Sequence, residues 1–127
     1  MKLTAVTLDC ADPVALAAFY REATGWETHP ESDAEFAGLV TPDGLFVGFQ
    51  RVAGYRAPTW PDQSGVPQQS HLDFDVEDAE DLEAAVRRLL ALGAVRAPNG
   101  PREGRWRVLL DPAGHPFCLS ERKGSSS

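Results

Sequence analysis

Cysteine is scarce in this chain of 127 residues, which contains only Cys10 and Cys118. Two cysteines are too few for the disulfide framework of a small secreted domain. The sequence also lacks an apolar run of the roughly 18 residues that a membrane span needs. The residues before Asp9 form only a short stretch in which apolar and polar side chains alternate, which is not the pattern of a signal peptide. We therefore expect a cytoplasmic protein with no membrane partner.

Basic residues are outnumbered, with 12 lysines and arginines against 19 aspartates and glutamates and a formal net charge of −7. An acidic surface repels phosphate backbones and anionic lipids, which argues against nucleic acid as a partner. The chain also has no glycine-rich phosphate loop, no G-x-S-x-G nucleophile pattern and no C-x-x-C pair.

What the sequence does contain is an internal repeat. Three landmarks recur in the same order in both halves: a D-x-x-D pattern (residues 9–12 and 75–78), a glycine after a helical stretch (Gly25 and Gly93), and a P-x-G turn (42–44 and 112–114). Each D-x-x-D follows a strand-like segment and opens a helix-like one. The repeat predicts an α+β fold of two modules, each with the order βαβββ.

The landmarks also set the expected element bounds. Asp12 is expected to cap a first helix that has Pro13 at its first position and ends at Gly25. A second helix is expected to start at Asp78 and to end at Gly93. The expected strands are 3–9, 26–29, 35–41, 45–51, 70–76, 94–97, 104–110 and 115–120. These elements give one domain, 1–122, made of modules 1–52 and 69–122, a linker 53–68 and a disordered tail 123–127.

Alternation along the strands predicts which side chains point away from the helices, toward a cleft. If residues 111–114 form the whole turn, Leu110 lies opposite His115 and Arg107 lies opposite Cys118. The second module then presents to the cleft His71, Asp73, Asp75, Arg105, Arg107, Leu109, Pro116, Cys118 and Ser120. Its core-facing set is Leu72, Phe74, Val76, Trp106, Val108, Leu110, Phe117 and Leu119. The same counting places in the cleft of the first module Ala37, Leu39, Phe46, Gly48 and Gln50.

Three blocks of the sequence carry a family resemblance. They read LDCADPVALAAFYREATGW, HLDFDVEDAEDLEAAVRRLLALGA and GRWRVLLDPAGHPFCL, and together they span nearly the whole chain. They resemble the glyoxalase-like domains of the vicinal oxygen chelate superfamily. The resemblance implies the glyoxalase/bleomycin resistance/dioxygenase-like fold, in which two βαβββ modules form curved sheets around a cleft. It also implies a homodimer, but it does not decide function, because the family holds both enzymes and metal-free binding proteins.

The resemblance further implies where a metal would be bound. The family's four ligand positions, two in each module, correspond here to Ala5, Gly48, His71 and Cys118. Ala5 and Gly48 have no side-chain donor, which leaves His71 and Cys118 as weak candidates, and two ligands make a poor site. We therefore expect no metal and no other cofactor. The alternative is a divalent ion held by an incomplete ligand set.

Two classes of function stay open. The first is a metal-independent protein that binds a small hydrophobic or aromatic molecule, which could carry an acidic group. The expected binding residues are Leu39, Phe46, Gln50, Trp60, His71, Asp73, Arg107 and Cys118. The second is a lyase, isomerase or dioxygenase of the same superfamily, either metal-dependent or using His71 beside Asp73 as a general base. Whether the protein is an enzyme is left open by the sequence.

Overall fold

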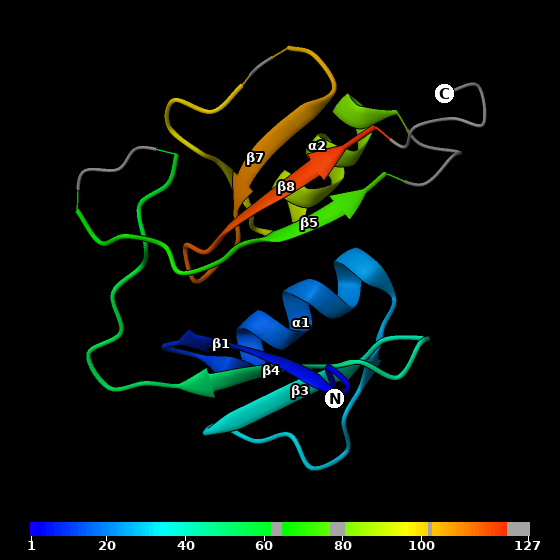
Figure 1. Cartoon of the computed structure of the whole chain (residues 1–127), viewed down its shortest axis with the longest axis vertical. Helices are drawn as coiled ribbons and strands as arrows, with labels where there is room; N and C mark the ends of the chain where they lie inside the picture. The colour runs from blue at the N-terminus through cyan, green and yellow to red at the C-terminus, as the bar shows by residue number, and fades with distance from the viewer. Residues whose placement is uncertain (62–64, 77–80, 102, 122–127) are drawn as a thin grey trace. The chain divides into compact units, whose positions relative to one another are not determined.

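The structure is a computed structural model, and it describes residues 1–61, 65–76, 81–101 and 103–121. The chain divides into two units, Met1–Ala57 (unit 1) and Pro58–Ser127 (unit 2), and each is described by itself (Figure 1). The expected helix start at Asp78 and the expected tail 123–127 lie outside the described residues.

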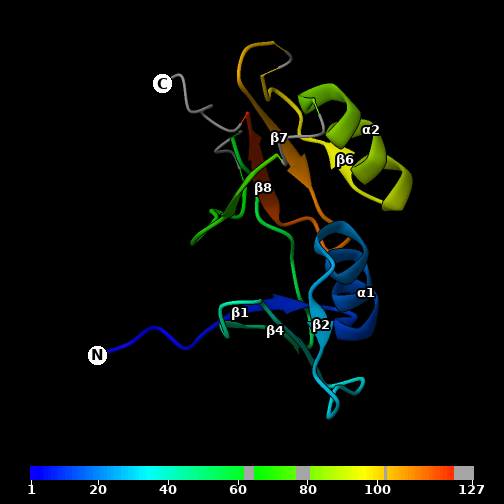
Figure 2. The same cartoon turned by 90° about the vertical axis from the view of Figure 1, so that its right-hand side faces the viewer.

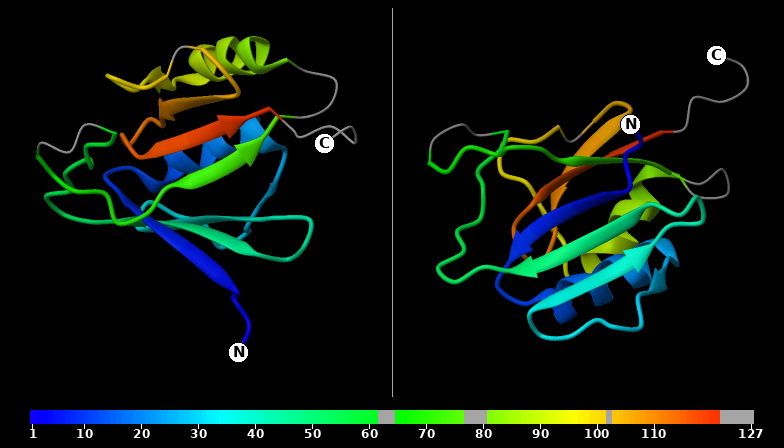
Figure 3. Two further views of the ribbon diagram at one scale, coloured as in Figure 1. Left: turned by 45° about the horizontal axis from the view of Figure 1, so that its top comes forward. Right: turned by 60° about the horizontal axis from the view of Figure 1, so that its bottom comes forward.

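Unit 1 has the order βαβββ. Its elements are β1 (Ala5–Cys10), α1 (Pro13–Thr24), β2 (Glu27–Thr28), β3 (Phe36–Val40) and β4 (Phe46–Arg51). The four strands form one sheet in the order β1-β4-β3-β2, in which β1 runs parallel to β4 and the other pairs are antiparallel. The right-hand view of Figure 3 shows β1, β4 and β3 side by side.

Unit 2 repeats this order. Its elements are β5 (Leu72–Asp75), α2 (Leu82–Leu92), β6 (Val95–Arg96), β7 (Trp106–Leu110) and β8 (Pro116–Ser120). The sheet order is β5-β8-β7-β6, again with only the first pair parallel. The predicted pair of βαβββ modules is confirmed. Within the part of the chain that is described, neither helix has the length and hydropathy needed to cross a bilayer.

Both helices begin and end at residues suited to these positions. The Asp12 carboxylate accepts a hydrogen bond from the backbone N–H of Ala15 at 3.1 Å, and Pro13 occupies the first helical position, as predicted. Gly25 ends α1 with a φ of +79°, a left-handed conformation that glycine adopts without strain. In unit 2, Asp81 caps α2 by accepting from the N–H of Ala84 at 2.7 Å.

The core of unit 1 lies between α1 and one face of its sheet (Figure 2). The ring of Tyr20 on α1 stacks on Phe49 of β4, with centroids 5.7 Å apart and planes 5° apart. The buried side chains of this core are Leu8, Cys10, Leu16, Phe19, Tyr20, Ala37, Leu39, Val47 and Phe49. The opposite face of the sheet carries no helix of unit 1, and we call it the open face of sheet 1.

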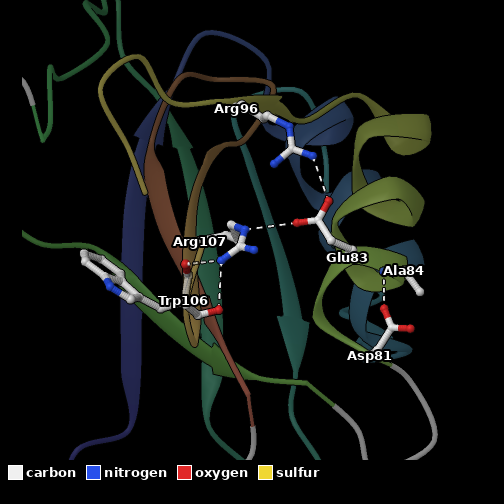
Figure 4. Close-up of polar contacts among 7 residues, drawn as sticks. Asp81, Glu83, Ala84, Arg96, Trp106 and Arg107 are labelled. Atoms are coloured by element: carbon white, nitrogen blue, oxygen red, sulfur yellow. Dashed lines mark hydrogen bonds and ion pairs between the residues drawn. The ribbon is translucent and has the colours of Figure 1, made fainter. Parts of the chain in front are cut away.

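The helix-facing side of the second sheet is identified by an ion pair. Glu83 on α2 accepts from Arg96 on β6 at 3.1 Å and from the Nε of Arg107 on β7 at 3.0 Å (Figure 4). Arg107 therefore points toward α2, which lies beside β6 and β7 (Figure 2). The opposite side, which we call the open face of sheet 2, carries Val108 and Cys118, which pack with Ala97.

The predicted strand faces are right for β4, β5 and β8 and wrong for β3 and β7. Leu110 pairs with Pro116 and Arg107 with Leu119, one residue away from the predicted register. As a result Arg107 and Leu109 face the helix, and the residues on the open face of β7 are Trp106, Val108 and Leu110. On β3 the same shift places Ala37 and Leu39 in the core and Phe36, Gly38 and Val40 on the open face.

The cause of the shift is the length of the hairpin loops. The N–H of Asp111 donates to the carbonyl of His115 at 2.9 Å, so three residues rather than two connect the strands. The third of them, Gly114, has a φ of +85°, which is the glycine bulge that follows a type I turn. The first hairpin is built in the same way, with Thr41 bonded to Leu45 and Gly44 at a φ of +89°.

Candidate functional site

The open face of sheet 2 brings together four of the predicted site residues. The indole of Trp60 stacks on the ring of His71, with centroids 4.5 Å apart and an angle of 20° between the planes. The Nε2 atom of His71 lies 3.5 Å from a carboxylate oxygen of Asp73, and its Nδ1 atom lies 3.1 Å from the side-chain oxygen of Gln68. Both ring nitrogens of His71 therefore face oxygen atoms.

Cys118 completes this group and is held as a thiol. It pairs with Asp73 across the parallel strands β5 and β8, and its side chain is buried. Burial raises the pKa of the Cys118 thiol to about 12, and the negative charge of Asp73 and a hydrogen bond with its carboxylate contribute. A thiol with so high a pKa is not an activated nucleophile near neutral pH.

Arg107 and Leu39 lie away from the open faces where they were predicted. The Arg107 guanidinium donates to Glu83 and to the backbone carbonyls of Gly104 and Trp106, at 3.1 and 2.9 Å respectively (Figure 4). Its side chain is only 8% exposed. Leu39 is fully buried in the core of unit 1. Both placements follow from the one-residue shift of register described above.

The open face of sheet 1 is built around Phe46. Its ring lies over the neighbouring glycines of β3 and β4, and a Cβ atom added to Gly38 would collide with it. A Cβ atom on Gly48 would lie 2.9 Å from the Phe46 ring and 2.7 Å from the Phe36 ring. The Phe36 and Phe46 rings are parallel to within 1°, with centroids 5.9 Å apart. Gln50 is exposed beside them on β4, in register with Phe36.

The unit 1 positions do not fit the metal centre that the resemblance implies. In unit 1, Ala5 offers no donor atom, and the space next to Gly48 is filled by two phenylalanine rings. In unit 2, donor atoms of His71, Asp73 and Cys118 lie within 4.8 Å of one another. Catalytic metal sites use three protein donors, and a bound ion would displace the thiol proton, so only the unit 1 half of the implied centre lacks its ligands.

Three aromatic residues of the open faces were not predicted. Phe36 and Trp106 lie opposite Gln50 and Ser120. The P-x-G pattern could have identified both, since a glycine in the third loop position is typical of the three-residue hairpin loop. His29 meets the Phe46 ring edge-on, with centroids 5.4 Å apart. Nothing in the sequence indicates that contact, because it depends on how the segment between β2 and β3 folds.

The chain contains two modules, each with the element order βαβββ and each forming one four-stranded sheet with one helix. This arrangement defines the glyoxalase/bleomycin resistance/dioxygenase class of fold. The family model described as "Glyoxalase-like domain" matches residues 5–120. The chain belongs to this family, as the three sequence blocks indicated. A comparison with curated proteins found no significant match.

Solved structures of similar fold include proteins of several kinds. A glyoxalase/bleomycin resistance protein/dioxygenase family enzyme from Burkholderia phytofirmans has a TM-score of 0.73 at 22% identity, over 95% of this chain and 98% of that one. The fosfomycin resistance protein FosX from Listeria monocytogenes, solved with Mn(II) and sulfate, has a TM-score of 0.68 at 19% identity, over 97% and 93%. The oxidase ChaP-H2 has a TM-score of 0.68 at 22% identity, over 100% and 98%. At these identities the similarity establishes the fold alone.

Proposed function

We propose that this chain is a metal-independent protein that binds a small hydrophobic or aromatic molecule on the open faces of its sheets. The observation that carries the proposal is the placement of Phe46 and Phe36 over Gly48. A metal ligand at this position would have to project from a residue that is glycine here, into space occupied by two rings. The same rings offer a flat apolar surface on which a ligand can stack.

Unit 2 has a polar surface of its own on the open face of sheet 2. The stacked pair of Trp60 and His71 offers a second flat surface, and Asp73 lies beside it with 70% of its side chain exposed. Arg107 was among the expected binding residues, but its guanidinium is already bonded to Glu83. We therefore favour a ligand that is recognised by stacking and by hydrogen bonds to His71 and Asp73.

An enzyme is the second candidate, and one contact favours it. The Nε2 atom of His71 lies 3.5 Å from Asp73, and a carboxylate in that place can stabilise the imidazolium that forms when His71 accepts a proton. In this alternative a bound ligand takes the place of the Gln68 oxygen at Nδ1 of His71, Nδ1 removes its proton, and Asp73 holds the charged ring in position. In the metal-dependent version an ion would be held by His71, Asp73 and Cys118 of unit 2, because Ala5 and Gly48 of unit 1 supply no donor.

A thermal-shift screen of the full chain against aromatic compounds tests the proposal, because a ligand that binds only the folded state raises the unfolding temperature. Phe46→Ala should remove the shift by deleting the stacking surface. Val14→Ala is the matched control, since Val14 is an exposed apolar residue on α1 of the same unit. Equal shifts in the wild type and in Phe46→Ala would contradict the proposal. Turnover that is lost in His71→Ala would replace it with the enzyme alternative.

A further inference from the structure

A second feature of unit 1 lies at the edge of the open face, where the segment between β2 and β3 meets the sheet. The structure has a hollow there with a volume of about 250 Å³. The residues around it include His29, Glu31, Asp33, Phe36, Gly38 and Phe46. Pockets for drug-sized ligands are usually about 300 Å³ or larger, so this one suits a molecule with a single ring and a short side chain.

The inner wall of the hollow is aromatic. Phe36 and Phe46 present parallel rings, and His29 closes one side with its ring at 83° to that of Phe46. The Nδ1 atom of His29 accepts a hydrogen bond from the backbone N–H of Glu31 at 3.2 Å. This hydrogen bond fixes the orientation of the imidazole ring at the side of the hollow.

The outer wall of the hollow is acidic. One carboxylate oxygen of Asp33 accepts hydrogen bonds from the backbone N–H groups of Glu35 and Phe36, at 2.9 and 3.0 Å. These two bonds lower the pKa of Asp33, so the carboxyl is ionised at neutral pH. Within the described parts of the chain, no ion pair involves Asp33 or Glu31, whereas the nearby Glu35 pairs with Arg51 at 3.5 Å.

Two carboxylates and a set of aromatic rings favour one kind of ligand. A cation is attracted by the carboxylates and also by the electron-rich faces of the phenylalanine rings. An anion would be repelled by both carboxylates, and no lysine or arginine is among the described residues that line the hollow. We infer that this hollow binds a small organic ammonium ion, with its apolar body against Phe36 and Phe46 and its charge toward Glu31 and Asp33. The inference rests on the proposed function, because it names the chemical class of ligand for the same aromatic surface.

Three probes of one shape and different charge test the inference: phenethylamine, which is cationic at pH 7, neutral phenylethanol, and anionic phenylacetate. We expect the full chain to bind phenethylamine about tenfold more tightly than phenylethanol, since two exposed charge pairs each contribute modestly. Phenylacetate should bind most weakly of the three. The preference for the amine should shrink as salt concentration rises, because exposed charges are screened.

Paired amide substitutions isolate the role of charge. Glu31→Gln with Asp33→Asn removes both charges, while the asparagine oxygen can still accept the two backbone hydrogen bonds. The double variant should lose the preference for phenethylamine and keep its binding of phenylethanol, and Glu31→Gln alone should lose part of the preference. Glu35→Gln is the matched control, because this acidic residue of the same segment pairs with Arg51 and does not line the hollow.

The outcomes separate this inference from the proposed function. If the three probes bind equally well and Phe46→Ala weakens all of them, the aromatic binding surface stands and the inference of a cationic ligand is overturned. If the double variant keeps the full preference for the amine, the inference is likewise overturned. If none of the three probes binds, the inference and the proposed aromatic surface both fail.

Discussion

Among single residues, Gly48 has the largest effect on metal binding, because it stands at a ligand position of the family and has no side-chain donor. A glycine in the middle of a strand weakens it, and here it makes room for the rings of Phe46 and Phe36. The adjacent strand has Gly38 in register with Gly48, so the Phe46 ring lies over a pair of glycines. The sequence alone identified Gly48 as a position without a donor atom, but it gave no sign that aromatic rings fill the space.

Gly48→Ala should destabilise unit 1, because its Cβ would lie 2.7 Å from the Phe36 ring and 2.9 Å from the Phe46 ring. Overpacking of this kind usually costs about 1–3 kcal/mol, which urea unfolding would measure. The same substitution made together with Phe36→Ala and Phe46→Ala should cost much less than it does alone. An equal cost in both backgrounds would show that the rings are not what Gly48 accommodates.

Cys118 is a second residue with a testable property. Its pKa of about 12 in the folded chain lies above the ordinary value of 9.0, so the folded state holds its proton more tightly than the unfolded state. Stability from this group is therefore fully present below about pH 9 and is lost as the pH rises toward 12. Cys118→Ser should flatten the fall in unfolding free energy over that range, as measured by urea unfolding at a series of pH values. An unchanged slope would contradict the shifted pKa.

Alkylation tests the same thiol from another direction. In a Cys10→Ala background, Cys118 should react slowly with iodoacetamide at pH 8, since the thiolate is the reactive form. Asp73→Asn should speed the reaction, because it removes the negative charge that opposes ionisation. Asp75→Asn is the control, since Asp75 pairs with Ser120 rather than with Cys118. Equal rates in the two variants would rule out the role of Asp73.

At the level of elements, the hairpin loops set which side chains reach the open faces. The sequence correctly predicted which side chains of β4, β5 and β8 point to the open faces, and it predicted both capping residues of α1. The faces of β3 and β7 were inverted because one extra loop residue shifts the register by one, and side chains alternate with a period of two. Pairing across a loop depends on the backbone conformation of Gly44 and Gly114, which composition and alternation do not specify.

The contact between α2 and its sheet is a second feature of this scale. Hydrogen bonds from Arg96 and then Arg107 lower the pKa of Glu83 (Figure 4). A lowered pKa means that the stability from Glu83 is present above its ordinary value of 4.5 and is lost as the pH falls through the folded pKa. Glu83→Gln should therefore reduce the loss of stability in acid, as followed by thermal unfolding between pH 3 and pH 7. A wild-type acid dependence in this variant would contradict the assignment.

Arg107→Met separates the structural role of Arg107 from the ligand-binding role that the sequence suggested. It should destabilise the chain by about 1–3 kcal/mol, because hydrogen bonds to a charged partner are lost while the apolar stem is kept. It should leave the affinity for aromatic probes unchanged, since the guanidinium faces α2. Titration of phenethylamine into this variant checks the second expectation. A loss of affinity without a loss of stability would return Arg107 to the binding site.

For the whole molecule, the duplicated βαβββ order was predictable because its landmarks are local: caps, glycine stops and P-x-G turns. Trp60 and His71 were both predicted for the site, but their stacking was not, since it depends on folding of the segment that precedes β5. We also expect a homodimer from the family resemblance. Sedimentation equilibrium over a range of concentrations would check this, and a monomer at the highest concentration would refute it.

The central claim is that this member of the glyoxalase-like family binds its ligand without a metal. The most direct test is calorimetric titration of phenethylamine and phenylethanol into the full chain before and after treatment with EDTA, with elemental analysis of the same samples. We predict unchanged affinities after treatment and no stoichiometric divalent ion in either sample. Binding that disappears with EDTA and returns with one equivalent of zinc or manganese would contradict the claim.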